Sequence, residues 1–270
     1  MSRRRMTGVC HICGKNGPLT FEHVPPRAAF NNRRVVTAGF DEVIRLGPDE
    51  VPTGPVQQRG AGGYTLCASC NNRTGSWYGR SFVDWCYQGM DILIRSGGKP
   101  SLIYMNYLFP LRVIKQIATM FFSVNGEQFS QVHPVLVRFI LNREQKYLPP
   151  RYRFFAYYNM SGKCRYSGVV AKVDTRTGKP FIYSEITYPP FGYVMTLDSQ
   201  PPDPRLSEIT GFSRFSYNEF RVFNLRLPVL QTHLWYPGDY RTEKEILRDR
   251  AKGELAMKQQ RDRTASGRPI

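Results

Sequence analysis

The chain has no apolar run that approaches the roughly 20 residues needed to span a bilayer. Its first residues are basic, but no apolar stretch follows them, so they do not form a secretory signal peptide. We therefore expect a soluble, cytoplasmic protein that does not bind membranes. Internal repeats and low-complexity segments are also absent.

Acidic residues are scarce, with 21 Asp and Glu against 38 Lys and Arg, so the formal net charge is +17. A field of that sign attracts polyanions, and nucleic acid is the expected partner. Hydrophobic residues make up 41% of the chain, which is enough to build a real core.

Cysteine is also rare, but four of the six cysteines form two CxxC pairs, Cys10-His-Ile-Cys13 and Cys67-Ala-Ser-Cys70. In a reducing compartment, four thiolates in two such pairs favour a structural tetrahedral zinc site over disulfides. A redox dithiol is the alternative, and it fits poorly because the chain shows no βαβ pattern around a single CxxC. We expect Cys86 and Cys164 to be buried as small hydrophobic residues.

The pattern of apolar residues predicts an α+β fold with a small zinc-stapled N-terminal module and a larger α+β domain that contains an antiparallel sheet. We place the module at residues 1–80, the α+β domain at 81–240 and a charged tail, helical and then frayed, at 241–270. Turn-forming residues between 31 and 63 predict an irregular connection. Helices are expected at 81–95, 111–124 and 131–143. Strands are expected at 64–66, 153–158, 168–173, 180–186, 192–197 and 220–227.

Glu22 and His23 follow the apolar stretch Leu19-Thr-Phe21 and precede Val24-Pro25. His23 is therefore expected at the end of a short strand, where proline forces a turn and the imidazole is held rigidly. A neutral histidine can take a proton from water, since its ordinary pKa of about 6.5 lies near physiological pH. His23 is thus a candidate general base.

Together these motifs resemble the HNH nucleases, which have the ββα-metal fold. The matching residues are Cys10-x-x-Cys13, Glu22-His23-x-Pro25 and Leu66-Cys67-x-x-Cys70-Asn71-Asn72-x-x-Gly75. The resemblance covers roughly residues 8 to 80 and is closest to the branch that carries EH-x-P and C-x-x-C-N-N-x-x-G signatures.

The resemblance implies that His23 is the general base and that Glu22 is a ligand of a single catalytic Mg²⁺ or Mn²⁺. The second metal ligand of the family falls at Asn71 or Asn72, and the HNH domains of RNA-guided CRISPR nucleases also use asparagine there. By that analogy we favour Asn72. The family's middle asparagine, which steadies the histidine loop, has no clear counterpart before Tyr64-Thr-Leu66. Gln57, Gln58 and Arg59 are the candidates.

Arg73 and Arg27 are candidates for contacts with substrate phosphates, with a solvated surface charge as the alternative for each. Arg3, Arg4, Arg5, Arg33 and Arg34 add to a basic footprint whose binding to nucleic acid should fall steeply with salt.

Residues 81–240 carry no motif that selects among target recognition, sensing and dimerisation, so a homo-oligomer is compatible with the sequence. The aromatic and basic residues between 151 and 166 either clamp single-stranded nucleic acid or form the two faces of a sheet. His133 and His233 have no companions at metal-ligand spacing, and we expect structural roles for both.

The sequence thus predicts a metal-dependent HNH endonuclease that hydrolyses DNA, with RNA as a less favoured substrate. Phage defence, restriction or mobile-element biology is the expected setting. The alternative is a zinc-stabilised nucleic-acid-binding or regulatory protein without cleavage activity.

Overall fold

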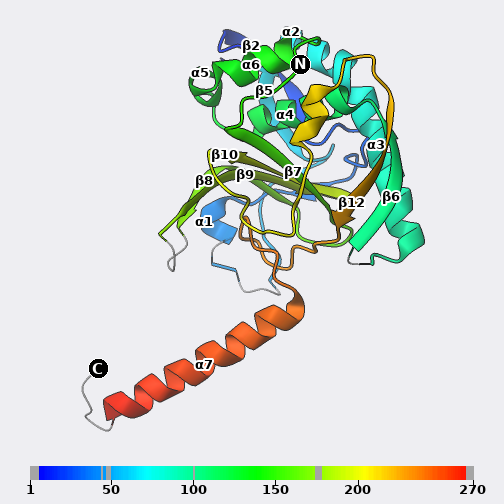
Figure 1. Ribbon diagram of the computed structural model, residues 1–270. Helices are drawn as coiled ribbons and strands as arrows, with labels where there is room; N and C mark the ends of the chain where they lie inside the picture. The colour runs from blue at the N-terminus through cyan, green and yellow to red at the C-terminus, as the bar shows by residue number, and fades with distance from the viewer. Residues whose placement is uncertain (1–5, 44, 47–49, 100, 174–177, 266–270) are drawn as a thin grey trace.

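The computed structural model describes residues 6–43, 45–46, 50–99, 101–173 and 178–265. Helices and antiparallel sheets are both present, which confirms the α+β class (Figure 1). The predicted basic residues Arg3, Arg4 and Arg5, and the last five residues of the predicted tail, lie outside the described residues.

The N-terminal part is built on a three-stranded antiparallel sheet. It contains β1 (Thr7–Val9), β2 (Asn16–His23) and β5 (Gly62–Cys67), in the order β1-β2-β5. The long connection between β2 and β5 has only three short elements, β3 (Val35–Val36), α1 (Phe40–Val43) and β4 (Val56–Gln57). The predicted irregular connection is therefore confirmed.

A continuous helical segment follows β5. It consists of α2 (Ala68–Thr74), the π-helical turn η1 (Gly75–Gly79) and α3 (Arg80–Ser96), and it ends at Gly97 in the left-handed region with φ of 61°. The helix predicted at 81–95 is confirmed. The domain boundary that we placed after residue 80 falls inside this segment.

One hydrophobic core also crosses that position. It joins Cys10, directly after β1, and Leu66 of β5 to Tyr78 of η1, Phe121 of the next helix and Tyr193 of the large sheet. The two-domain division stays a prediction, but any separate motion of the two parts would have to open this shared core.

The helix α4 (Pro110–Val124) lies at the centre of this core. It contacts α3, η1, β5 and two strands of the large sheet, β8 (Arg165–Val173) and β9 (Pro180–Tyr188), and twelve of its residues are buried, including the polar Lys115, Gln116 and Thr119. The prediction at 111–124 is confirmed.

The single helix predicted at 131–143 is wrong. The structure has two shorter helices, α5 (Phe129–Val132) and α6 (Pro134–Leu141), separated at His133. Pro134 explains the break, because proline lacks the backbone N–H that a continuing helix requires and is well suited to the first helical position. His133 is buried, and its Nδ1 lies 3.0 Å from the Tyr152 hydroxyl, which agrees with a structural role.

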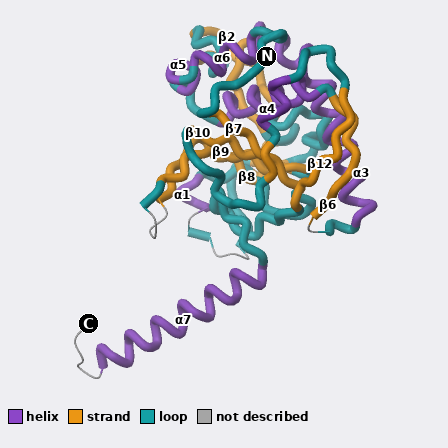
Figure 2. The backbone as a smooth tube through the Cα atoms, viewed as in Figure 1, coloured by secondary structure: helices purple, strands orange, loops and turns teal. Residues whose placement is uncertain are grey.

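The large sheet has five antiparallel strands in the order β11-β7-β10-β9-β8. Their bounds are β7 (Tyr152–Tyr158), β8 (Arg165–Val173), β9 (Pro180–Tyr188), β10 (Phe191–Leu197) and β11 (Ser207–Glu208). In Figure 2, helices lie on one side of this sheet, and most of the chain on the other side is loop. Four of the predicted strands are thus confirmed in one antiparallel sheet.

The strand predicted at 220–227 exists as β12 (Arg221–Pro228), but it does not join the large sheet. It pairs with β6 (Ser101–Leu108), which the sequence analysis missed, and a short 3₁₀ helix, η2 (Thr210–Arg214), precedes it. The pairing spans more than a hundred residues of sequence, so local patterns could not reveal it.

The last helix, α7 (Glu243–Ala265), extends away from the rest of the molecule (Figure 1). Its described residues are exposed apart from Ile246 at its start and the partly exposed Glu245, which agrees with the predicted solvated helix. No helix among the described residues is both long and apolar enough to cross a membrane. Cys86 is buried as expected, but the expectation for Cys164 is wrong, because Cys164 is exposed directly before β8.

Candidate functional site

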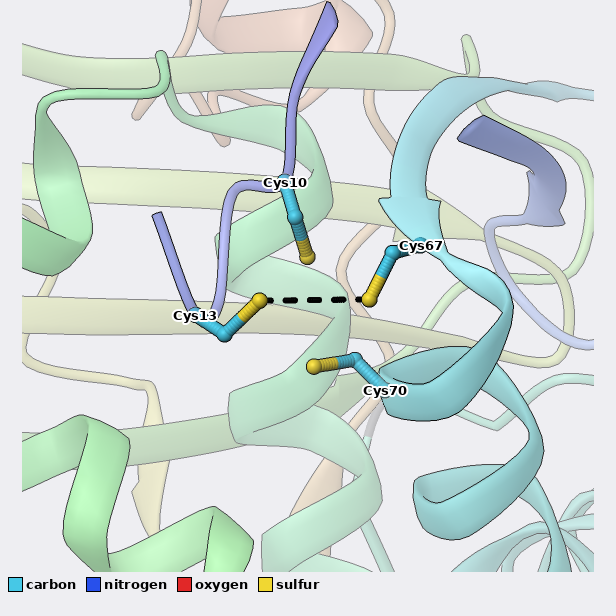
Figure 3. Close-up of side chains that lie close together, drawn as sticks. All are labelled: Cys10, Cys13, Cys67 and Cys70. Atoms are coloured by element: carbon cyan, nitrogen blue, oxygen red, sulfur yellow. Dashed lines mark hydrogen bonds between the residues drawn. The ribbon is translucent and has the colours of Figure 1, made fainter. Parts of the chain in front are cut away.

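The four predicted zinc ligands come together at one point, although 53 residues of chain lie between the two pairs. Cys10 and Cys13 belong to the turn between β1 and β2, Cys67 ends β5, and Cys70 lies in the first turn of α2. Figure 3 shows the four sulfurs pointing toward one another from these three elements.

The spacing of these sulfurs fits a zinc ion. All four lie within 4.8 Å of one another, and the Cys13 and Cys67 sulfurs are 3.8 Å apart. Zinc–sulfur bonds of about 2.3 Å put the sulfurs of a tetrahedral site about 3.8 Å apart. A hydrogen bond from the Cys70 thiol lowers the pKa of Cys10 to about 4, so one thiolate is already favoured. The cluster is therefore a possible zinc site.

Local backbone bonds shape the first pair of ligands. The Gly14 amide donates to the Cys10 carbonyl at 2.9 Å, and Gly14 has a φ of 69°, which glycine adopts without strain. The His11 amide then donates to the Thr65 carbonyl, which fixes this turn against β5. These bonds bring Cys10 and Cys13 to the end of β5, where Cys67 begins the second pair.

His23 lies at the end of β2, as the sequence predicts. Its Nε2 is 3.1 Å from the Arg59 carbonyl oxygen. A carbonyl can only accept, so Nε2 carries the proton and the neutral ring presents Nδ1 as an acceptor. Burial lowers the pKa of His23, a bond to Arg59 opposes this, and the charges of Arg27 and Arg59 lower it further. The neutral imidazole required of a general base is thus favoured.

Glu22 is buried, with 8% of its surface exposed, and lies opposite Gly63 on β5. Burial raises the pKa of this carboxyl to about 7, and a hydrogen bond from Asn71 opposes the rise. A buried carboxylate with so few donors favours either a proton or a cation beside it. Glu22 therefore fits the role of a hard ligand for a divalent ion.

The two candidate asparagines occupy different environments. Asn71 is half-buried, is hydrogen-bonded to Glu22, and donates its amide nitrogen to the Thr20 hydroxyl at 3.0 Å. Asn72 is exposed on the next position of α2. The structure thus brings Asn71 and Glu22 together, whereas our sequence analysis favoured Asn72.

Glu22 and His23 belong to two different groups of side chains. Successive side chains of a strand leave from opposite faces, so Glu22 lies with Asn71 while His23 lies with Phe21, whose ring centroid is 4.9 Å away. Among the described residues, the cysteine cluster is the only group of three or more His, Cys, Asp or Glu side chains close enough to share an ion. An ion at Glu22 would need amide oxygen or water as its further ligands.

Asn31 is a site residue that the sequence analysis missed. It is fully buried and makes three hydrogen bonds of 2.7 Å, donating to the carbonyls of Pro25 and Ala61 and accepting from the Ala61 amide. Gly60 packs against it with a φ of 106°, and a side chain at Gly60 would collide with Asn31. This asparagine therefore ties the chain after His23 to the loop whose Arg59 carbonyl holds the imidazole.

Gln57, Gln58 and Arg59 were the candidates for steadying the loop that carries His23, and in the structure Asn31 makes bonds of this kind. Arg59 contributes its carbonyl oxygen, whereas the side-chain oxygen of Gln57 is buried without a hydrogen-bond partner among the described residues. In the sequence, Asn31 is a polar residue that directly follows Ala29-Phe30. Sequence alone does not distinguish it from a surface asparagine.

The predicted phosphate-binding residues are both at the surface. Arg27 is exposed and close enough to His23 to act on its pKa. Arg73 is exposed on α2, with its guanidinium 5.7 Å from the centre of the Trp77 ring. Arg27 and Arg59 are therefore the arginines nearest the imidazole in electrostatic terms.

Comparison with known proteins adds no relative. No family model, no curated protein and no solved structure matches this chain.

Proposed function

We propose that this chain is a metal-dependent endonuclease of the HNH type that hydrolyses phosphodiester bonds in DNA. The observation that carries the proposal is the bond from His23 Nε2 to the Arg59 carbonyl, which supports a neutral imidazole with Nδ1 free to accept a proton. The cysteine cluster, which lies at the other end of the β2–β5 pairing, supports a zinc-stapled module of the kind to which the resemblance points.

In the proposed reaction, Nδ1 of His23 takes a proton from water as the water oxygen attacks phosphorus, and the bond from phosphorus to the 3′ oxygen breaks. Glu22 and the oxygen of Asn71, or of Asn72, would hold Mg²⁺ or Mn²⁺. When bound, such an ion neutralises charge on the phosphate and on the departing oxygen. A phosphodiester that meets both groups of side chains would have to lie across the end of β2, where Glu22 and His23 are neighbours in sequence.

The charge of the chain supports DNA as the substrate. Arg27 and Arg59 are exposed beside His23, and the formal net charge of +17 favours a polyanion. RNA is the second candidate, and a cytoplasmic role in restriction or phage defence is the setting we propose.

Nicking of supercoiled plasmid DNA tests the function. Wild-type protein with Mg²⁺ or Mn²⁺ is expected to convert supercoiled plasmid to the open-circular form, and EDTA is expected to stop it. His23→Ala should lower the rate by about a thousandfold, the usual range for loss of a general base, while zinc content and thermal unfolding stay unchanged. Absence of any metal-dependent cutting of DNA or RNA by the wild-type protein would contradict the proposal.

A zinc-stabilised nucleic-acid-binding protein without cleavage activity is the second candidate. It is favoured by the separation of Glu22 and His23 into two groups of side chains. On this alternative, the wild-type protein binds DNA in gel-shift experiments, and His23→Ala changes nothing.

A further inference from the structure

Three aromatic rings form a row on one face of the antiparallel strand pair β2–β5. Phe21 and Tyr64 are direct partners across the two strands, and their ring centroids are 5.5 Å apart. On its other side, Phe21 meets the His23 ring at 4.9 Å, and both contacts are edge-to-face. Tyr64 is thus one aromatic side chain removed from the imidazole.

The outer end of this row is open to solvent. Tyr64 is 48% exposed, so stacking of a further ring on it would bury additional aromatic surface. The strand residues opposite Glu22 and His23 are Gly63 and Gly62, which carry no side chain. The β5 strand therefore places no bulky group opposite His23.

The opposite face of the β2–β5 strand pair packs against the rest of the protein. Leu66 is fully buried, and Thr20 receives the bond from Asn71 of α2. The β2–β5 strand pair thus packs onto the rest of the protein through this inner face. The aromatic row on the outer face is not required for that contact, so it is available to a ligand.

We propose that Tyr64, backed by Phe21, is a stacking platform for an unpaired base next to the phosphate that the water activated by His23 attacks, and that single-stranded DNA is the preferred substrate. This inference rests on the proposed function. Every nucleobase has a π-face that stacks on an aromatic ring, whereas in a duplex these faces are covered by neighbouring bases. Arg59 and Arg27 lie exposed at the His23 end of the row and suit the backbone of the same strand.

The test is equilibrium binding of the full-length protein to fluorescein-labelled DNA, measured by fluorescence anisotropy in buffer without chelator and without added Mg²⁺ or Mn²⁺, so that the cysteine cluster keeps its zinc. A short mixed-sequence single strand is compared with its duplex. Tyr64→Ala is expected to weaken binding to the single strand by about tenfold, in the range known for loss of one base–aromatic stack, and to leave duplex binding nearly unchanged. Tyr64→Phe, which keeps the ring, should bind as the wild type does.

Tyr107→Ala is the matched control, because Tyr107 is a tyrosine of β6 with a similar exposure of 47%. It should leave both affinities unchanged. Tyr64→Leu keeps an apolar side chain on β5 but has no π-face, so it should bind the single strand as weakly as Tyr64→Ala does. It serves in place of Tyr64→Ala if that variant does not fold.

A spectroscopic signature completes the experiment. A single strand that contains 2-aminopurine should lose fluorescence on binding to the wild type and to Tyr64→Phe, because stacking quenches this base, but not on binding to Tyr64→Leu. Equal weakening of single-strand and duplex binding in Tyr64→Ala and Tyr64→Leu, or no change in either, would overturn the platform. These measurements need no cleavage. A protein that stacks the base but never cuts DNA would contradict the proposed nuclease function and would still support the stacking platform.

Discussion

The His11 imidazole donates its Nδ1–H to the carbonyl oxygen of Phe122 at 3.0 Å, across 111 positions of sequence. His11 lies between Cys10 and Cys13 of the first CxxC pair, and Phe122 lies near the end of the buried helix α4. This bond, together with the shared core, joins the cysteine cluster to the centre of the molecule.

Loss of zinc should therefore destabilise more than the N-terminal sheet. We expect about one zinc per chain in the wild type and none in Cys67→Ser, because three thiolates leave the tetrahedral site open. Thermal unfolding of Cys67→Ser, followed by circular dichroism, should begin at a lower temperature and involve most of the helical signal. Metal content is measured by mass spectrometry.

Cys164→Ser is the control for this experiment, because Cys164 is exposed and lies outside the cluster. It should keep both its zinc and its unfolding midpoint. A Cys67→Ser protein that holds as much zinc as the wild type would show that the cluster is not a zinc site.

Asn31→Ala should lower the free energy of unfolding by about 3 kcal/mol, since three buried hydrogen bonds are lost at about 1 kcal/mol each. Urea unfolding measures this value. Nicking by the folded variant should also slow, because the loop that presents the Arg59 carbonyl to His23 is no longer tied to Pro25. A folded Asn31→Ala protein with wild-type nicking would contradict this positioning role.

The two asparagines of α2 can be separated by their effect on nicking. Asn71→Ala should reduce the Mg²⁺-dependent rate by about 100-fold, because Asn71 lies beside Glu22. Asn72→Ala should leave stability unchanged, because its side chain is exposed. A rate that falls in Asn72→Ala and not in Asn71→Ala would instead support the ligand that the sequence favoured.

The pH dependence of nicking should differ between low and saturating Mg²⁺. A general base is active when neutral, and the pKa of His23 is lowered, so its acid limb should lie below about 6.5. Glu22, with its pKa raised to about 7, binds a cation only after it loses its proton. At low Mg²⁺ the rate should therefore already fall as the pH drops through about 7.

At saturating Mg²⁺ the ion displaces that proton, so the fall should move to lower pH, where His23 becomes charged. Initial rates of plasmid nicking over a pH series measure both limbs. Identical profiles at the two Mg²⁺ concentrations would show that Glu22 does not bind the ion. Glu22→Gln, which cannot ionise, should lose the Mg²⁺-dependent limb along with most of its activity.

The residues of the cysteine cluster and the position of His23 at a strand end could be read from the sequence, because both depend on short spacings. A CxxC pair forms its own turn, and Val24-Pro25 ends a strand wherever that strand lies. The helices at α3 and α4 and four strands of the large sheet were likewise predicted from local apolar periodicity. The break at His133 was also local, but the apolar pattern outweighed Pro134 in the prediction.

Tertiary structure alone decided which distant segments meet. The pairing of β12 with β6, the burial of Asn31 against Ala61 and the exposure of Cys164 each depend on residues far away in the chain or on the packing around them. Local patterns carry no information about such partners, because the same residue types also satisfy their bonds with water. The sequence therefore determined the composition, the four thiols and the Glu-His pair. The fold determined which side chains lie next to Glu22 and His23.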